Sequence, residues 1–97
     1  MYTINNAINL TKVKGLNASK LLDISATEVL HISLEKGGTF PTHTSPTDAH
    51  LILLEGVITF FIEDQEFEIQ KHQVFDFEKN KEHHLKAHKD SKFLIIR

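Results

Sequence analysis

Short runs in which hydrophobic and polar positions alternate occur along most of the chain. In the clearest of them, Leu30, Ile32 and Leu34 alternate with a histidine and a serine. The same period of two recurs in residues 58–62, 66–70 and 75–78. These runs are rich in β-branched and aromatic side chains, which fit the pleated surface of a sheet. The pattern therefore predicts a series of short β-strands.

Turn-forming residues separate the predicted strands. The turn signals are Gly37-Gly38, Pro41 to Pro46, Glu55-Gly56, Glu63 to Gln65 and Lys79 to Glu82. Glycine, proline, asparagine and aspartate favour turns because of their backbone freedom, fixed φ or local hydrogen bonds. Short strands at such regular spacing are typical of an all-β sandwich or barrel.

Two segments leave a choice open. Residues 18–23 could form one helical turn, but no convincing cap precedes them and the flanking residues resemble strands, so we predict a strand. Leu51 to Leu54 are apolar at consecutive positions, as in a strand that is buried on both faces. If one face fills a barrel interior, the other must be covered by a second sheet or by another subunit.

Composition narrows the class of protein. The 97 residues predict a single domain spanning 1–97, and the net charge of −2 argues against nucleic acid or an anionic membrane as the main partner. The absence of cysteine excludes disulfides, thiolate metal sites and cysteine nucleophiles. No apolar run approaches the roughly 20 residues that span a bilayer, and the first ten residues lack a secretory signal pattern. We therefore expect a cytoplasmic protein.

Seven histidines are the main candidates for chemistry. His43 lies in a proline-bounded segment that we expect to be a turn. His50 follows Asp48 by two residues, so both side chains point to one face if a strand has already begun there. His83 opens a further predicted strand, on which His84 and His88 face the opposite way.

Two stretches of the chain resemble the two sequence motifs of the cupin family. Residues 38–56 are similar to the first motif, which has a glycine, two histidines one residue apart, an acidic residue, an apolar strand and a glycine. Residues 72–87 resemble the second, in which a glycine-led strand runs through a turn to one histidine. By this resemblance His43 matches the first metal-binding histidine, Asp48 the acidic ligand and His83 the histidine of the second motif.

The resemblance implies a fold and an assembly. It implies an all-β, antiparallel double-sheet β-barrel of the cupin or jelly-roll kind, with about eight to ten strands, as in small single-domain cupins of type 2. It also implies a homodimer, which agrees with strands such as Leu51 to Leu54 and Phe93 to Ile96 that are apolar on both faces. The chain departs from the motifs at Ser45, which replaces the second histidine, at His72, which replaces a glycine, and at Glu78, which replaces a proline.

The resemblance further implies a divalent metal ion, which could be Zn, Ni, Mn or Fe. His43, His83 and Asp48 would form a set of two imidazoles and one carboxylate, and His50 could supply the imidazole that is missing at Ser45. The alternative for Asp48 is a turn residue that hydrogen-bonds the backbone. The alternative for His50 is a core histidine held by one hydrogen bond.

Three classes of function follow. The first is a small barrel that binds a divalent metal and a small molecule in its mouth, with a binding or sensing role. The second is a metal-dependent enzyme of the dioxygenase, isomerase or decarboxylase type. The third is a metal-free barrel whose role is association. No nucleophile–base pair and no phosphate-cradling glycine loop is present in the sequence, so catalytic residues stay unknown.

Overall fold

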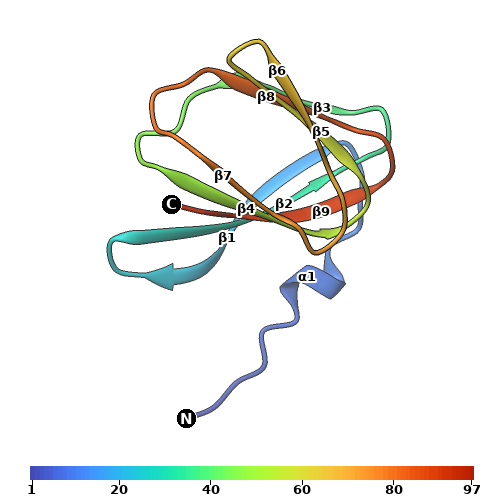
Figure 1. The fold of residues 1–97 in the computed structure, drawn as a ribbon. Coiled ribbons are helices and arrows are strands. Elements are labelled where there is room, and N and C mark those ends of the chain that lie inside the picture. The colour runs from blue at the N-terminus through green and yellow to red at the C-terminus, as the bar shows by residue number, and fades with distance from the viewer.

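Nine β-strands and one short helix make up the structure, a computed structural model that describes residues 1–97 (Figure 1). In chain order they are α1 (Ala7–Leu10), β1 (Leu16–Ile24), β2 (Thr27–Leu34), β3 (Thr39–His43), β4 (Ala49–Glu55), β5 (Ile58–Ile62), β6 (Gln65–Ile69), β7 (Val74–Phe77), β8 (His83–Ala87) and β9 (Ser91–Ile96). The all-β prediction is confirmed. The single helix has four residues, and no helix is long and apolar enough to cross a membrane.

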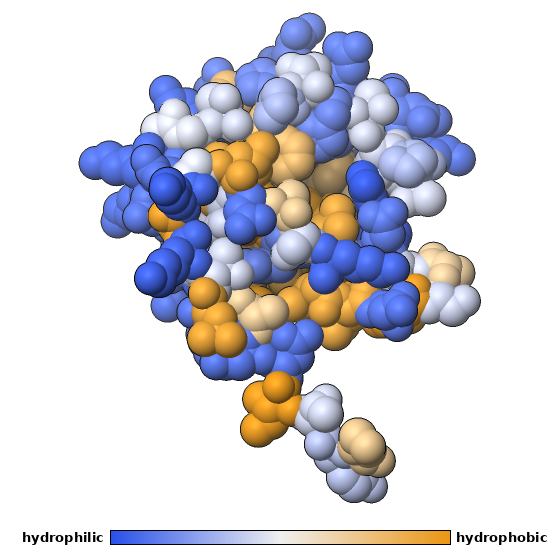
Figure 2. All heavy atoms as spheres, turned by 180° about the vertical axis from the view of Figure 1, so that it is seen from behind, coloured by the Kyte–Doolittle hydropathy of each residue, from blue (hydrophilic) through white to orange (hydrophobic).

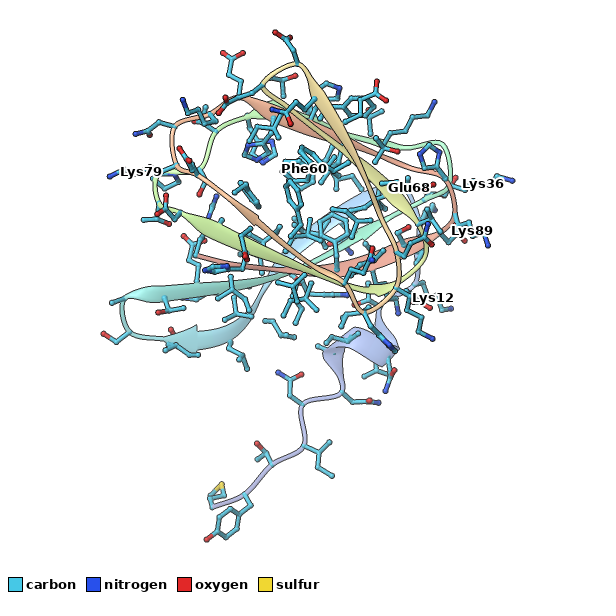
Figure 3. The ribbon with its side chains drawn as sticks, viewed as in Figure 1. Lys12, Lys36, Phe60, Glu68, Lys79 and Lys89 are labelled. Atoms are coloured by element: carbon cyan, nitrogen blue, oxygen red, sulfur yellow. The ribbon has the colours of Figure 1, made fainter.

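The strands form two antiparallel sheets that face each other (Figure 1). The larger sheet has the order β1-β2-β9-β4-β7, and the smaller has the order β3-β8-β5-β6. A cluster of 13 buried hydrophobic residues fills the space between the sheets. Phe60 lies within it, whereas labelled lysines such as Lys36 and Lys89 point outward (Figure 3). This arrangement confirms the double-sheet barrel.

Residues 18–23 belong to a strand, as predicted. They lie in β1, which pairs with β2 from Leu16 opposite Leu34 to Ile24 opposite Thr27. The pairing shifts register between Lys20 and Leu22. A single helical turn is unfavourable because it fixes several backbone dihedrals for one or two hydrogen bonds. As a strand, the same residues form hydrogen bonds with β2 along its length.

The segment around His43 differs from the prediction. Instead of a turn from Pro41 to Pro46, residues up to His43 continue β3, with Pro41 inside the strand. This is possible because β3 is an edge strand that pairs only with β8. Proline lacks a backbone N–H, and an edge strand can accommodate it on the side that has no neighbouring strand. The pairing shifts register between Phe40 and His43. His43 therefore stands at a strand end.

The outer face of the larger sheet is only partly covered. In β4, Leu51 and Leu53 are fully buried in the core, whereas Ile52 and Leu54 on the opposite face are half-buried. Part of the cover comes from the N-terminal segment. The buried Lys92 anchors this segment by donating a hydrogen bond from Nζ to the carbonyl oxygen of Ile8 in α1 at 2.6 Å. Residues 1–6 leave the barrel as an arm that carries hydrophobic side chains (Figures 1 and 2).

Candidate functional site

His43 and His83 meet at one end of the barrel. His43 ends β3 and His83 begins β8, and the two residues are direct partners in the antiparallel register. The Nε2 atoms of the two rings lie 3.1 Å apart. His83 is buried and packs against Phe60 and Phe77 of the core, and His43 stacks on Phe40.

Backbone carbonyls fix the tautomer of both rings. Nδ1 of His43 lies 2.7 Å from the carbonyl oxygen of Pro41, and Nδ1 of His83 lies 2.9 Å from that of Lys81. A carbonyl oxygen can only accept a hydrogen bond, so each Nδ1 carries the hydrogen. In the neutral rings both Nε2 atoms then carry lone pairs, and these lone pairs face each other.

Burial keeps His83 in its neutral form. Desolvation is the largest cause that lowers the pKa of His83, and the nearby His43, Arg97 and His84 lower it further. The hydrogen bond to the Lys81 carbonyl acts in the opposite direction and does not overcome the burial. With both Nδ1 hydrogens committed to carbonyl oxygens, neither Nε2 of the neutral pair has a hydrogen to donate to the other.

The pair fits a shared metal ion. Two imidazole nitrogens bound to one zinc ion at about 2.0–2.1 Å each lie roughly 3.0–3.4 Å apart, which agrees with the 3.1 Å between His43 and His83. Metal-binding histidines usually donate their other ring N–H to a carbonyl or carboxylate, as both rings do here. No group of three or more His, Cys, Asp or Glu side chains is arranged to hold a metal. Any further ligand would come from outside the chain.

The structure does not bring Asp48 and His50 to this pair. Asp48 is exposed in the loop before β4, where its Oδ1 accepts a hydrogen bond from the backbone N–H of Lys79 at 3.0 Å. His50 lies on the outer face of the larger sheet, because its neighbour Leu51 fills the core. Its Nδ1 contacts Oδ1 of Asp76 at 2.6 Å.

Ser45 occupies the place of the missing motif histidine and is buried beside the pair. Its hydroxyl donates a hydrogen bond to the carbonyl oxygen of Thr47 at 2.6 Å, and its own carbonyl accepts one from the N–H of Asn80. The hydroxyl thus forms a hydrogen bond within the loop between β3 and β4, and the carbonyl connects this loop to the turn before β8. His84 and His88 lie on the outer side of the smaller sheet, as predicted, where His84 stacks on Phe61.

A cavity of about 90 Å³ adjoins the two histidines. Its lining consists of Leu30, Ile32, Phe40, His43, Ser45, Phe60, Phe77, His83, Leu85, Phe93, Ile95 and Arg97. Hydrophobic core residues form most of this lining, and the polar groups are two imidazoles, one hydroxyl and one guanidinium. No carboxylate lines the cavity.

Sequence reasoning missed Arg97. The signal was present in the period of two, because Phe93 and Ile95 are core residues of β9 and the next position with the same parity is Arg97. The backbone of Arg97 continues this pairing beyond the end of the strand, with hydrogen bonds to Glu28 in both directions. The alternation that identifies the core thus also places a guanidinium at its end.

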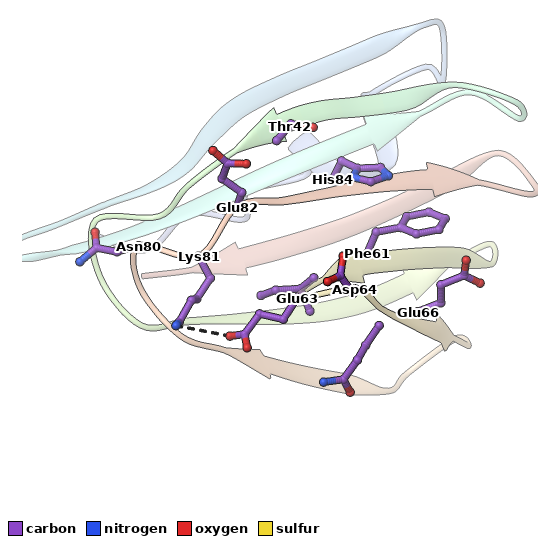
Figure 4. A pocket seen from close by; sticks show the side chains of 11 residues that line it. Thr42, Phe61, Glu63, Asp64, Glu66, Asn80, Lys81, Glu82 and His84 are labelled. Atoms are coloured by element: carbon purple, nitrogen blue, oxygen red, sulfur yellow. Dashed lines mark ion pairs between the residues drawn. The ribbon is translucent and has the colours of Figure 1, made fainter.

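A larger hollow lies on the outer side of the smaller sheet (Figure 4). Its volume is about 620 Å³, and it is open and lined mostly by exposed polar side chains, among them Glu63 and Lys81, which form an ion pair of 3.6 Å. Neither His43 nor His83 lines it. The small cavity is the better candidate site, because the two imidazoles line it.

Solved structures share this fold over nearly the whole chain. An RmlC-like cupin from Desulfovibrio desulfuricans has a TM-score of 0.85 at 15% identity, covering 99% of this chain and 95% of that one. A cupin superfamily protein from Desulfitobacterium hafniense has a TM-score of 0.84 at 16% identity, covering 92% and 84%. At this level of identity, the likeness shows the fold.

Sequence comparison adds one relative and one family. An uncharacterised protein from Methanocaldococcus jannaschii is 38% identical over 47 residues, which is 48% of this chain and 40% of that protein's length. Its structure, described as an RmlC-like cupin with a double-stranded β-helix fold, has a TM-score of 0.78 at 23% identity, covering 87% of this chain and 80% of that one. The family model described as "Cupin domain" matches residues 30–96. The chain therefore belongs to the cupin family.

Proposed function

We propose that this cupin binds a divalent metal ion through His43 and His83 and a small molecule in the adjoining cavity, in a binding or sensing role. The observation that carries the proposal is the pair of Nε2 atoms 3.1 Å apart, with both Nδ1 atoms committed to carbonyl oxygens. A cation bound between these two nitrogens would accept a lone pair from each of them. When bound, such an ion would supply Lewis acidity and open coordination positions.

A binding role is favoured over catalysis by the lining of the cavity. An enzyme needs a general acid or base within reach of its substrate. The lining has no carboxylate, and its only side chains of the usual general acid–base type are the two imidazoles that the metal would occupy. Enzymatic activity of the dioxygenase, isomerase or decarboxylase type is therefore the second candidate, and it would need its acid–base groups from the ligand or from water.

Thermal unfolding of chelator-stripped, untagged protein tests the metal site. An ion that binds only the folded state at a hundredfold excess over its Kd stabilises the fold by about 2.7 kcal/mol. In a chain of this size that raises the melting temperature by roughly 10 °C or more. The rise should weaken below about pH 6, because protons compete for the imidazoles.

Matched variants assign the ligands. His43→Ala and His83→Ala should abolish the rise, and His83→Gln provides a second test if the alanine variant folds poorly. His84→Ala, on the outer side of the same strand, should keep it. His50→Ala and Asp48→Ala should also keep it, since both side chains lie away from the pair. If Zn, Ni, Mn and Fe(II) all leave the melting temperature unchanged, the metal site is disproved.

A further inference from the structure

Arg97 lies at the polar end of the cavity, on a fixed stretch of backbone. Its N–H donates to the carbonyl oxygen of Glu28 at 2.9 Å, and its carbonyl accepts from the N–H of Glu28 at 2.6 Å. The side chain lines the cavity together with His43, Ser45 and His83. It also lines a surface groove of about 300 Å³, so Arg97 borders both the cavity and the surface.

The hydrogen-bonding capacity of this guanidinium is largely unused. A guanidinium has five N–H donors in a planar fork. One of them, on Nη2, lies 3.4 Å from Oε2 of Glu28, which is a long contact to a half-exposed carboxylate. Nε is buried and has no hydrogen-bond partner. A buried charged donor without a partner is unfavourable in the folded state, and a ligand anion would satisfy it.

The rest of the cavity selects the kind of anion. A volume of about 90 Å³ limits the ligand to a small molecule. The wall is largely hydrophobic, with Phe60, Phe77 and Phe93 among its residues. An inorganic oxyanion would gain nothing from such a wall, whereas a short organic acid has both a charged end and an apolar body.

We propose that the cavity binds a small organic carboxylate, with Arg97 holding the carboxylate group through its planar fork and the core phenylalanines contacting the carbon chain. Arginine binds carboxylates through two parallel N–H···O bonds, which lysine cannot reproduce. This inference rests on the proposed function, because it names the class of small molecule for the same cavity. It assigns the recognition to Arg97 and leaves the metal to His43 and His83.

Ligand titrations followed by NMR chemical shifts test this, with propionate and pyruvate as probes and propionamide as the neutral isostere of propionate. Wild-type protein should bind both carboxylates and should bind propionamide at least tenfold more weakly. Arg97→Gln should weaken carboxylate binding at least tenfold. The carboxylate affinity of Arg97→Lys should lie between those of wild type and Arg97→Gln. Lys89→Gln removes the same charge from an exposed site outside the cavity and should bind as wild type does.

Several outcomes would overturn the inference. The first is that Arg97→Gln binds propionate as tightly as wild type does. The second is that wild type binds propionamide as tightly as propionate. The third is that wild type binds inorganic phosphate as tightly as either carboxylate. A purely structural role would lower the melting temperature of ligand-free Arg97→Gln and leave its carboxylate affinity unchanged, which also contradicts the inference.

Each titration is run on chelator-stripped and on Zn-loaded protein. Carboxylate binding that survives while no metal shifts the melting temperature would disprove the metal site and support the role of Arg97.

Discussion

His31 and His83 are buried rings that link the stability of the fold to pH. Burial is the largest cause that lowers the pKa of each ring. At His31 the charge of Lys92 lowers the pKa further, and Glu55 opposes it. Nε2 of His31 is buried without a hydrogen-bond partner, so a proton there would have no acceptor. The pKa of each ring is therefore lower in the folded protein than in the unfolded chain.

Stability should fall as the pH drops below about 6.5. Above the unfolded-state pKa of about 6.5 the two rings are neutral in both the folded and the unfolded state. The free energy of unfolding is therefore not reduced by protonation of these rings. Between that value and the lower folded-state pKa the unfolded chain binds protons first, and the free energy of unfolding decreases. Urea unfolding of chelator-stripped protein from pH 7.5 to pH 5 measures this. His31→Leu and His83→Leu should each flatten the dependence, and a profile that is identical in wild type and both variants would contradict the assignment.

The four metal ligands suggested by the sequence show what a pattern can predict at this scale. The motif resemblance paired His43 with His83, and the structure places them 3.1 Å apart. The pairing of Asp48 with His50 assumed that a strand had already begun at Asp48. Since β4 begins at Ala49 and Leu51 fills the core, His50 points outward and Asp48 stays in the loop. Which residues of a strand fill the core decides the face of the others, and four consecutive apolar residues, Leu51 to Leu54, leave that choice open in the sequence.

At the scale of elements, the turn between β4 and β5 depends on Gly56. Its φ of +93° lies in a region that residues with a side chain rarely adopt. A Cβ at this position would also overlap with the side chain of Ser91 and approach the carbonyl oxygen of Asp90 to 2.7 Å. The turn is therefore packed directly against the start of β9.

Gly56→Ala should destabilise the fold by about 3 kcal/mol or more, because backbone strain of about 1–2 kcal/mol and overpacking of about 1–3 kcal/mol add. Gly15→Ala is the matched control. Gly15 also has a positive φ, of +57°, but a Cβ there meets no atom within 4 Å. Its cost should stay near 1–2 kcal/mol. Chemical denaturation of both variants checks the difference, and equal costs would show that the contact with β9 is unimportant.

The elements were predictable where alternation and turns coincided, as in β2, β5 and β7. β3 was not, because Pro41 and Pro46 together resemble a loop. Whether proline can stay in a strand depends on whether that strand has one neighbour or two, and the order of strands in a sheet is a long-range property. The hydrophobic pattern of the segment alone carries no information about it.

For the whole molecule, the outer face of the larger sheet bears on assembly. Ile52 is in register with Leu94 on one side and with Val74 on the other, so these apolar side chains are neighbours on that face. Val74 is 59% exposed, and the N-terminal arm adds the fully exposed Tyr2 and Ile4. Exposed apolar surface of this kind usually marks an interface.

The homodimer expected from the sequence should therefore form through this face and the arm. Light scattering at micromolar concentration should give twice the 11.1 kDa mass of the chain. Val74→Glu should shift the equilibrium toward monomer, because a charge would be buried in the interface. Thr39→Glu, at an exposed position of the smaller sheet, should leave the mass unchanged. A wild-type mass of one chain would contradict the prediction.

The position of β9 also determines when the protein can fold during its synthesis. β9 is the last strand in the sequence and lies between β2 and β4 in the larger sheet. Until β9 is in place, β2 and β4 therefore lack the partner that they share. Unpaired strand edges recruit other chains, so nascent copies are most exposed to aggregation in the interval before residues 91–96 emerge.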